Sequence, residues 1–234
     1  MKRNGIWKVR VVLEEYFSLI ARSLPLILRG IATTMQVFLS TSVLSIVMGL
    51  CMGLCCCNRL RIPVISSIIE VITFVLRGIP FYIQLLIVYF ALPDLIGFNL
   101  NPFSASVIAL GFCSAGYVAQ LVRGAINAMP VAQWEAAFSL GYSVRRSLIY
   151  IILPQMLRII IPSINNELDS LLKSTSVIST IGMLELTRVG MNLVSREMEP
   201  VPIYLTIALI YLMVSAALNI ITKKLERQLA YVKN

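Results

Sequence analysis

The sequence predicts an all-α integral membrane protein with five transmembrane helices, and three observations lead to this fold class. Hydrophobic residues make up 58% of the 234 residues, and charged residues make up only 13%. A soluble domain has roughly 45–50% apolar and roughly 25% charged residues. A soluble domain of this size could not bury all the apolar surface of this chain. The chain also contains five stretches that are long and apolar enough to cross a bilayer.

The charged residues and cysteines exclude several function classes. The chain has 20 Lys+Arg against 11 Asp+Glu, a formal net charge of +9, and no histidine. Catalytic triads and metal sites that need imidazole are therefore excluded, and no GxxxxGK[ST] phosphate-binding loop is present. We expect the five cysteines to pack inside helices, with palmitoylation at the end of a span as the alternative; they are Cys51, Cys55, Cys56, Cys57 and Cys113.

Residues 1–30 are predicted to form an amphipathic helix in the membrane interface. The basic start would suit a signal peptide, but charges interrupt the apolar region that would have to follow, so we expect no cleavage; these are Glu14, Glu15, Arg22 and Arg29. Apolar residues recur at helical spacing, which is typical of a helix lying in the interface; they are Val9, Leu13, Tyr16, Phe17 and Ile20.

The five predicted spans lie within residues 31–222, at about 31–57, 64–93, 103–124, 155–181 and 201–222. The first has no charge, and the second is interrupted by Arg77-Gly78-Ile79-Pro80. The third is rich in small residues, which let helix backbones approach closely in lipid. The fourth starts apolar and becomes polar in its middle. An odd number of spans places the two termini on opposite sides of the membrane.

Lysine and arginine gather on one set of flanks, which orients the chain. These ten residues are Arg59, Arg61, Arg123, Arg145, Arg146, Arg158, Lys223, Lys224, Arg227 and Lys233. The opposite flanks, 91–102 and 185–200, hold only Arg188 and Arg196. The loop 125–153 and the tail 223–234 are therefore predicted to be cytoplasmic, and the N-terminus extracytoplasmic. The basic N-terminal segment disagrees with this rule, but its charges can lie on the polar face of an interfacial helix.

The loop 125–153 carries a recognisable motif. A short helix is predicted between Pro130, at its first turn, and Gly141, just past its end. The loop contains Glu-Ala-Ala, then three residues and Gly, then nine residues and Ile, then one residue and Leu-Pro. This spacing is that of the EAA signature, so the loop resembles that of bacterial ABC importer permeases. The resemblance implies the type I ABC importer permease fold, with a cytoplasmic coupling helix that docks on a separate ATPase. It assigns ATPase coupling to Glu135, Ala136, Ala137, Gly141, Arg145, Ile151, Leu153 and Pro154.

Two further segments resemble permeases for polar amino acids, the histidine/glutamine/arginine branch. Residues 76–85 (LRGIPFYIQL) look like that family's arginine-glycine-threonine-proline stretch, and residues 166–176 (NELDSLLKSTS) look like its fourth-span segment. Ile79 and Ser174 stand where the family commonly has Thr and Asp, and Asp169 stands where it commonly has an apolar residue. Asp169 favours a cationic amino acid only if it does not pair with Lys173, so the sequence alone predicts the class of substrate and not the particular amino acid.

Ionisable groups at bilayer depth are costly, so each needs a partner or a function. One polar stripe on the fourth span must face other helices or a water-filled cavity; it comprises Asn166, Asp169, Ser170, Lys173 and Ser176. Asp169 and Lys173 are four residues apart, so they form either an internal ion pair or a wall of the substrate pathway. Glu167 lies off this stripe and could accept a substrate ammonium group or bond to backbone near Arg77.

Arg77 has two interpretations. It could pair with Glu70, two turns earlier on the same helix, or it could meet a substrate carboxylate at the break made by Gly78 and Pro80. The substrate-pathway candidates are Arg77, Gln84, Asn166, Glu167, Asp169, Ser170, Lys173 and Ser176.

The resemblance implies a permease subunit that moves a polar amino acid across a bacterial inner membrane by alternating access, driven by a separate ATPase. Such a chain is not an enzyme and holds no cofactor or metal, because ATP and Mg bind the ATPase. The implied partners are two cytoplasmic ATPase subunits, a second permease copy or homologue, an extracytoplasmic substrate-binding protein, the amino acid and the lipid bilayer, but no nucleic acid. A secondary transporter or channel subunit is the alternative, and it would leave the EAA loop unexplained.

Overall fold

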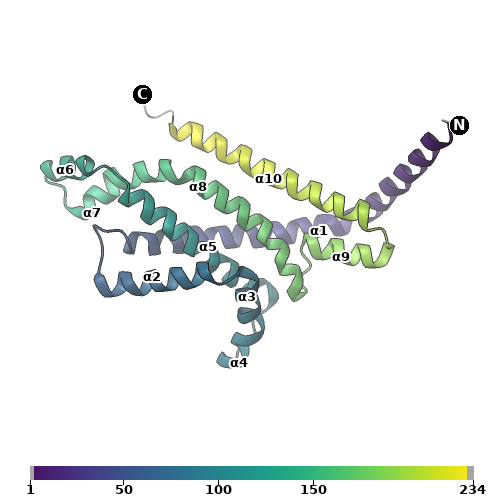
Figure 1. Cartoon of the computed structure of the whole chain (residues 1–234), viewed down its shortest axis with the longest axis horizontal. Helices are drawn as coiled ribbons and strands as arrows, with labels where there is room; N and C mark the ends of the chain where they lie inside the picture. The colour runs from purple at the N-terminus through teal and green to yellow at the C-terminus, as the bar shows by residue number, and fades with distance from the viewer. Residues whose placement is uncertain (1–2, 231–234) are drawn as a thin grey trace.

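The computed structural model describes residues 3–230, with side chains from 14 to 228. Lys233 and the side chains of Val9 and Leu13, which entered the predictions above, lie outside that description. The described chain consists of helices joined by short turns, and its long helices run side by side (Figure 1). The α6 end and the α9 end lie at opposite extremes of this bundle.

The first helix is longer than one membrane span. α1 runs without interruption from Arg3 to Cys55, so the predicted interfacial segment and the first span form one helix. It contains Pro25, and its N-terminal part leans away from the other helices (Figure 1). Further along, Gly53 packs against α5 (Pro102–Asn127) so closely that an added Cβ would lie 2.6 Å from the Cβ of Val122. Small residues therefore bring α1 and α5 into close contact.

The predicted second span is sharply bent. α2 (Pro63–Gly78) and the helical segment that begins with α3 (Phe81–Leu86) meet at 103°. That segment continues through the π-helical turn η1 (Ile87–Ala91) into α4 (Leu92–Ile96). Pro80 lies at the break, where it has no backbone N–H to continue the hydrogen-bond ladder. Among the described residues, four single helices are long and apolar enough to span, and the bent pair makes a fifth if it counts as one.

The helices after α5 complete the bundle. α6 (Val131–Ser139) is followed by α7 (Val144–Ser147), the π-helical turn η2 (Leu148–Ile152) and α8 (Leu153–Ser174). Helical structure thus resumes at Val144, before the predicted start of the fourth span. The wide turn η2 directly precedes α8, whose second residue, Pro154, has no N–H for the α-helical ladder. The 3₁₀ turn η3 (Thr175–Ile181), α9 (Leu186–Glu197) and α10 (Pro200–Ala230) follow.

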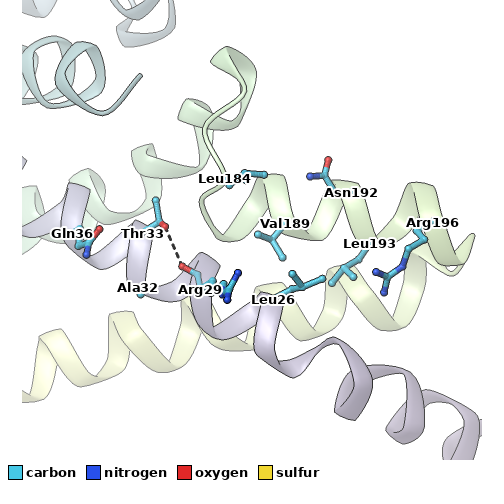
Figure 2. A pocket seen from close by; sticks show the side chains of 10 residues that line it. All are labelled: Leu26, Arg29, Ala32, Thr33, Gln36, Leu184, Val189, Asn192, Leu193 and Arg196. Carbon is cyan, nitrogen blue, oxygen red and sulfur yellow. Dashed lines mark hydrogen bonds between the residues drawn. The ribbon is translucent and has the colours of Figure 1, made fainter. Parts of the chain in front are cut away.

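Buried Glu185 fixes the start of α9. Its carboxylate accepts hydrogen bonds from the backbone N–H groups of Thr187, at 2.8 Å, and Arg188, at 2.7 Å. The hydroxyl of Tyr211 on α10 donates to it at 3.1 Å. The side chain of Thr34 on α1 accepts from the N–H of Leu186 at 3.1 Å. These bonds join α1, α9 and α10 at one end of the bundle, where a large cavity lies between α1 and α9 (Figure 2).

Candidate functional site

A polar cavity of about 320 Å³ lies where the bend of the second span meets α5 and α8. Its walls come from sequence segments that are far apart, and it is lined by Arg77, Ile79, Pro80, Phe81, Leu110, Cys113, Ser114, Tyr117, Glu167, Ser170, Leu171 and Ser174. Gln84 stabilises the bend, because its side-chain amide donates to the carbonyls of Leu76 and Ile79, both at 2.7 Å. Gln84 therefore shapes the cavity without lining it.

Glu167 supplies the carboxylate of this cavity. Ser114 on α5 donates to its Oε1 at 2.6 Å, and Ser45 on α1 donates to Ser114 at 2.8 Å. Glu167 forms no ion pair with any other residue in the described part of the chain. It thus presents a negative group with unused acceptor capacity to the cavity, which suits an ammonium ligand.

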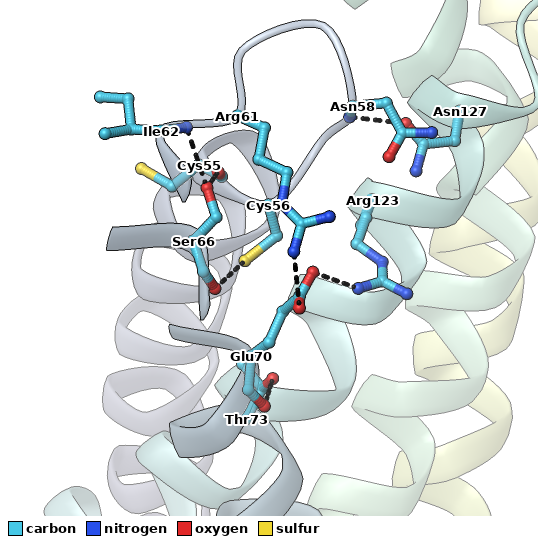
Figure 3. Close-up of polar contacts among 10 residues, drawn as sticks. All are labelled: Cys55, Cys56, Asn58, Arg61, Ile62, Ser66, Glu70, Thr73, Arg123 and Asn127. Atoms are coloured by element: carbon cyan, nitrogen blue, oxygen red, sulfur yellow. Dashed lines mark hydrogen bonds and ion pairs between the residues drawn. The ribbon is translucent and has the colours of Figure 1, made fainter. Parts of the chain in front are cut away.

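Arg77 supplies the guanidinium group of the same cavity. Its Nε donates to the carbonyl of Thr73 at 3.2 Å, and the other guanidinium nitrogens have no hydrogen bond to the described side chains. Of the two interpretations of Arg77, the structure contradicts the pair with Glu70. Glu70 instead pairs with Arg123 at 3.0 Å and with Arg61 at 3.5 Å (Figure 3). These partners lie beside Glu70, whereas Arg77 is two helical turns, about 10 Å, away along α2.

The other polar residues of α8 point elsewhere. Lys173 donates to Asp169 at 2.5 Å within α8, and Ser215 on α10 donates to the other carboxylate oxygen, so the hydrogen bond from Ser215 joins α8 to α10. Asn166 is exposed, and Ser176 donates to the backbone carbonyl of Lys173. None of these four residues, of which Ser176 lies in η3, lines the cavity. The cavity face of α8 is instead made by Glu167, Ser170, Leu171 and Ser174.

Sequence reasoning missed several cavity residues. Cys113, Ser114 and Tyr117 on α5 and Ser174 on α8 line the space, but the small residues of the third span were read as packing residues only. The sequence feature that could have indicated this role is the hydroxyl of Ser114, which stands among small and apolar residues of the third span. Ser114 is 53 positions from Glu167, so only the packing of α5 on α8 brings them together.

The EAA segment forms a short helix at one end of the bundle. In α6, Trp134 and Ala137 are 2% and 1% exposed and face inward, whereas Glu135 and Ala136 are exposed. Gly141 has φ +79°, a left-handed conformation that favours glycine, and its N–H donates to the carbonyl of Phe138. Of the remaining motif residues, Arg145 and Pro154 are exposed, and Ile151 and Leu153 are half-buried. The helix thus keeps an anchored face and an open face.

The loop between α1 and α2 holds α6 in place. The guanidinium carbon of Arg59 lies 5.3 Å from the ring centroid of Trp134 and 5.8 Å from that of Phe138. One residue earlier, the N–H of Asn58 donates to the side chain of Asn127, at the end of α5 (Figure 3). The loop therefore joins α6 to α5, and through the pair of Arg61 with Glu70 it also joins α2.

The cysteines beside this loop have a packing role in the structure. Cys56 and Cys57 are buried, and burial raises the pKa of both thiols above the usual value, so they remain protonated. Cys113 is also buried, whereas Cys51 and Cys55 are exposed.

Comparisons with known proteins agree with this architecture. The family model for the binding-protein-dependent transport system inner membrane component matches residues 42–231. The arginine transport system permease protein ArtQ of Bacillus subtilis is 34% identical over 91% of this chain and 96% of its own length. The glutamine transport system permease protein GlnP of Escherichia coli K12 is 31% identical over 91% and 97%, respectively.

Solved structures show the same fold. The crystal structure of an amino acid ABC transporter with histidines has a TM-score of 0.81 at 30% identity, covering 89% of this chain and 96% of that one. An inward-facing MetNI methionine ABC transporter has a TM-score of 0.76 at 18% identity, covering 88% and 97%. The chain therefore belongs to the family of inner membrane components of binding-protein-dependent transport systems, the permease subunits of ABC importers.

Proposed function

We propose that this permease moves a polar amino acid through the polar cavity at the bend of the second span, which we call the Glu167 cavity. The observation that carries the proposal is the presence of two opposite charges in one cavity, because the Glu167 carboxylate and the Arg77 guanidinium both line it without pairing with each other. A zwitterionic amino acid carries an ammonium group that Glu167 can accept and a carboxylate that Arg77 can bind with charge-assisted hydrogen bonds. The amino-acid permeases among its relatives support this substrate class.

The open face of α6 is the proposed docking surface for the ATPase. Family membership implies an ATPase and a substrate-binding protein as partners. We assign the contact with the ATPase to Glu135, Ala136 and the Gly141 turn, because they are exposed at the end of the bundle. ATP and Mg would bind that partner. Two ATPase copies and a second permease copy or homologue would complete the complex.

The orientation follows from the basic residues. Arg59, Arg61 and Arg123 lie at the α6 end, so the positive-inside rule places this end in the cytoplasm. The α9 end and the N-terminus then face the substrate-binding protein. Nucleotide-driven movement of α6 would reach the spans through its buried contacts, because Trp134 packs in one core cluster with Val122 of α5, Ile152 of η2 and Met156 of α8.

Uptake in reconstituted vesicles tests this function. Vesicles that hold the permease, its ATPase and its binding protein are supplied with labelled amino acids, with and without ATP inside. Glu167→Gln should raise the KM for the best substrate by roughly 10-fold or more, since a hydrogen bond to a charged group contributes about 1.5–3 kcal/mol. Glu226→Gln, which changes a carboxylate near the C-terminal end of α10 and outside the cavity, is the matched control. Uptake that continues without the ATPase would instead establish a secondary transporter.

A further inference from the structure

A second, larger cavity of about 590 Å³ lies between α1 and α9, at the end of the bundle opposite α6 (Figure 2). Arg29 enters it from α1 and Arg196 from α9, and the amides of Gln36 and Asn192 also line it. The rest of the lining is mainly apolar and includes Leu26 and Leu193. It shares no lining residue with the Glu167 cavity, so it is a separate site.

The position of Arg29 along α1 places this cavity at headgroup depth. Arg29 lies 26 residues before Cys55, where α1 ends near the basic residues of the opposite surface, and 26 helical residues span about 39 Å. The hydrocarbon core of a bilayer is about 30 Å thick, and about 40–45 Å with its headgroups. Between Arg29 and Cys55, α1 carries no charged residue. Arg29 therefore lies in the headgroup layer opposite the coupling helix.

The charges in the cavity favour an anion. Arg29 has no ion-pair partner among the residues whose side chains are described. The Nε of Arg196 binds Glu197 at 2.7 Å, which leaves its two terminal nitrogens as donors. A guanidinium fork matches the oxygen geometry of a phosphate group. The apolar lining would remain unfilled by a small soluble anion, whereas acyl chains would cover it.

We propose that this cavity binds an anionic phospholipid, with its phosphate at Arg29 and Arg196 and its acyl chains along the apolar lining. The lipid would bridge α1 and α9, two elements already joined where Thr34 accepts from Leu186. Two guanidinium groups attract a phosphate headgroup from whichever leaflet supplies it, and the apolar lining accepts the attached acyl chains. This inference concerns the surrounding membrane and does not depend on which substrate is carried.

Thermal unfolding in neutral detergent tests the proposal, with phosphatidylglycerol, phosphatidylcholine or glycerol 3-phosphate added. Phosphatidylglycerol should raise the Tm of the purified permease–ATPase complex, and the other two should not. In R29Q/R196Q, the lipid concentration for half of this shift should rise about 25-fold, because each lost cation weakens binding about fivefold. K224Q/R227Q, which removes two charges near the other end of α10, is the matched control and should respond as the unmodified chain does.

An unchanged response of R29Q/R196Q to phosphatidylglycerol would overturn the proposal. An equal shift with glycerol 3-phosphate would also overturn it, because the site would then bind a free phosphate. If R29Q/R196Q does not fold, R29K/R196K keeps both charges without the guanidinium fork and should retain a weaker response; its complete loss of response would count against a phosphate site. If the substrate-binding protein, and not lipid, protected the Asn192→Cys variant from thiol labelling at that position, the cavity would be a protein interface instead.

Discussion

Replacement of Arg59 by leucine should uncouple ATP hydrolysis from transport. The side chain is exposed and lies over two aromatic rings of α6, at 5.3 Å and 5.8 Å from their centroids. One exposed cation–π contact contributes about 0.5–1 kcal/mol, so two contacts contribute about 1–2 kcal/mol. A loss of this size changes an equilibrium about 5–30-fold. The substitution should therefore increase, by about 5–30-fold, the ratio of molecules in which α6 has left its contacts with the α1–α2 loop to those in which it keeps them.

The position of α6 can be followed through Trp134. The chain contains two tryptophans, so Trp7→Phe leaves Trp134 as the only indole. Because Trp134 is 2% exposed, acrylamide should quench it weakly in the parent and more strongly after Arg59→Leu. In vesicles, the same variant should move fewer substrate molecules per ATP hydrolysed. Arg59→Lys retains the cation and should restore most of the coupling.

Arg146→Leu serves as the control, because Arg146 is an exposed basic residue of α7 that forms no ring contact in the described structure. If Arg59→Leu and Arg146→Leu gave the same transport per ATP and the same quenching, the inferred role of Arg59 in seating α6 would be refuted.

Two further substitutions test the ends of the bundle. Gly141→Trp should leave the protein in the membrane but prevent co-purification of the ATPase, because Gly141 occupies a left-handed conformation on the proposed docking face; normal co-purification would contradict that assignment. Glu185→Ala should destabilise the protein by about 2–4 kcal/mol, because it removes the cap of α9 and leaves the Tyr211 hydroxyl without its carboxylate. Glu185→Gln keeps the volume and one acceptor oxygen and should cost less, and thermal unfolding in detergent measures both; equal losses would contradict this expectation, because they would show that neither the volume nor a neutral acceptor replaces the carboxylate.

The apolar stretches and the family were readable from the sequence because they depend on local composition and spacing. The continuity of α1 was not, since Glu14, Arg22 and Arg29 suggested an interruption, while helical backbone bonds continue regardless of side-chain polarity. The bend at Pro80 was readable as a break, but its angle of 103° depends on packing against α5.

The face of α8 that lines the cavity could not be chosen from sequence alone. Both the row through Glu167 and Ser170 and the row through Asp169 and Lys173 recur at helical spacing. Only the packing of α8 against α5 and α10 assigns the first row to the cavity and the second to the contact with Ser215. Spacing within one helix gives the relative positions of its side chains, but it does not give the rotation of that helix within a bundle.

Direct binding tests the central claim, that the Glu167 cavity holds the amino acid. The permease–ATPase complex is purified without the substrate-binding protein, and binding of the best labelled substrate is measured at equilibrium. We predict saturable binding that Glu167→Gln weakens at least about tenfold, the loss expected for one charge-assisted hydrogen bond, while Glu226→Gln leaves it unchanged. Equal affinity of the Glu167→Gln complex and the unmodified complex would show that the substrate binds elsewhere.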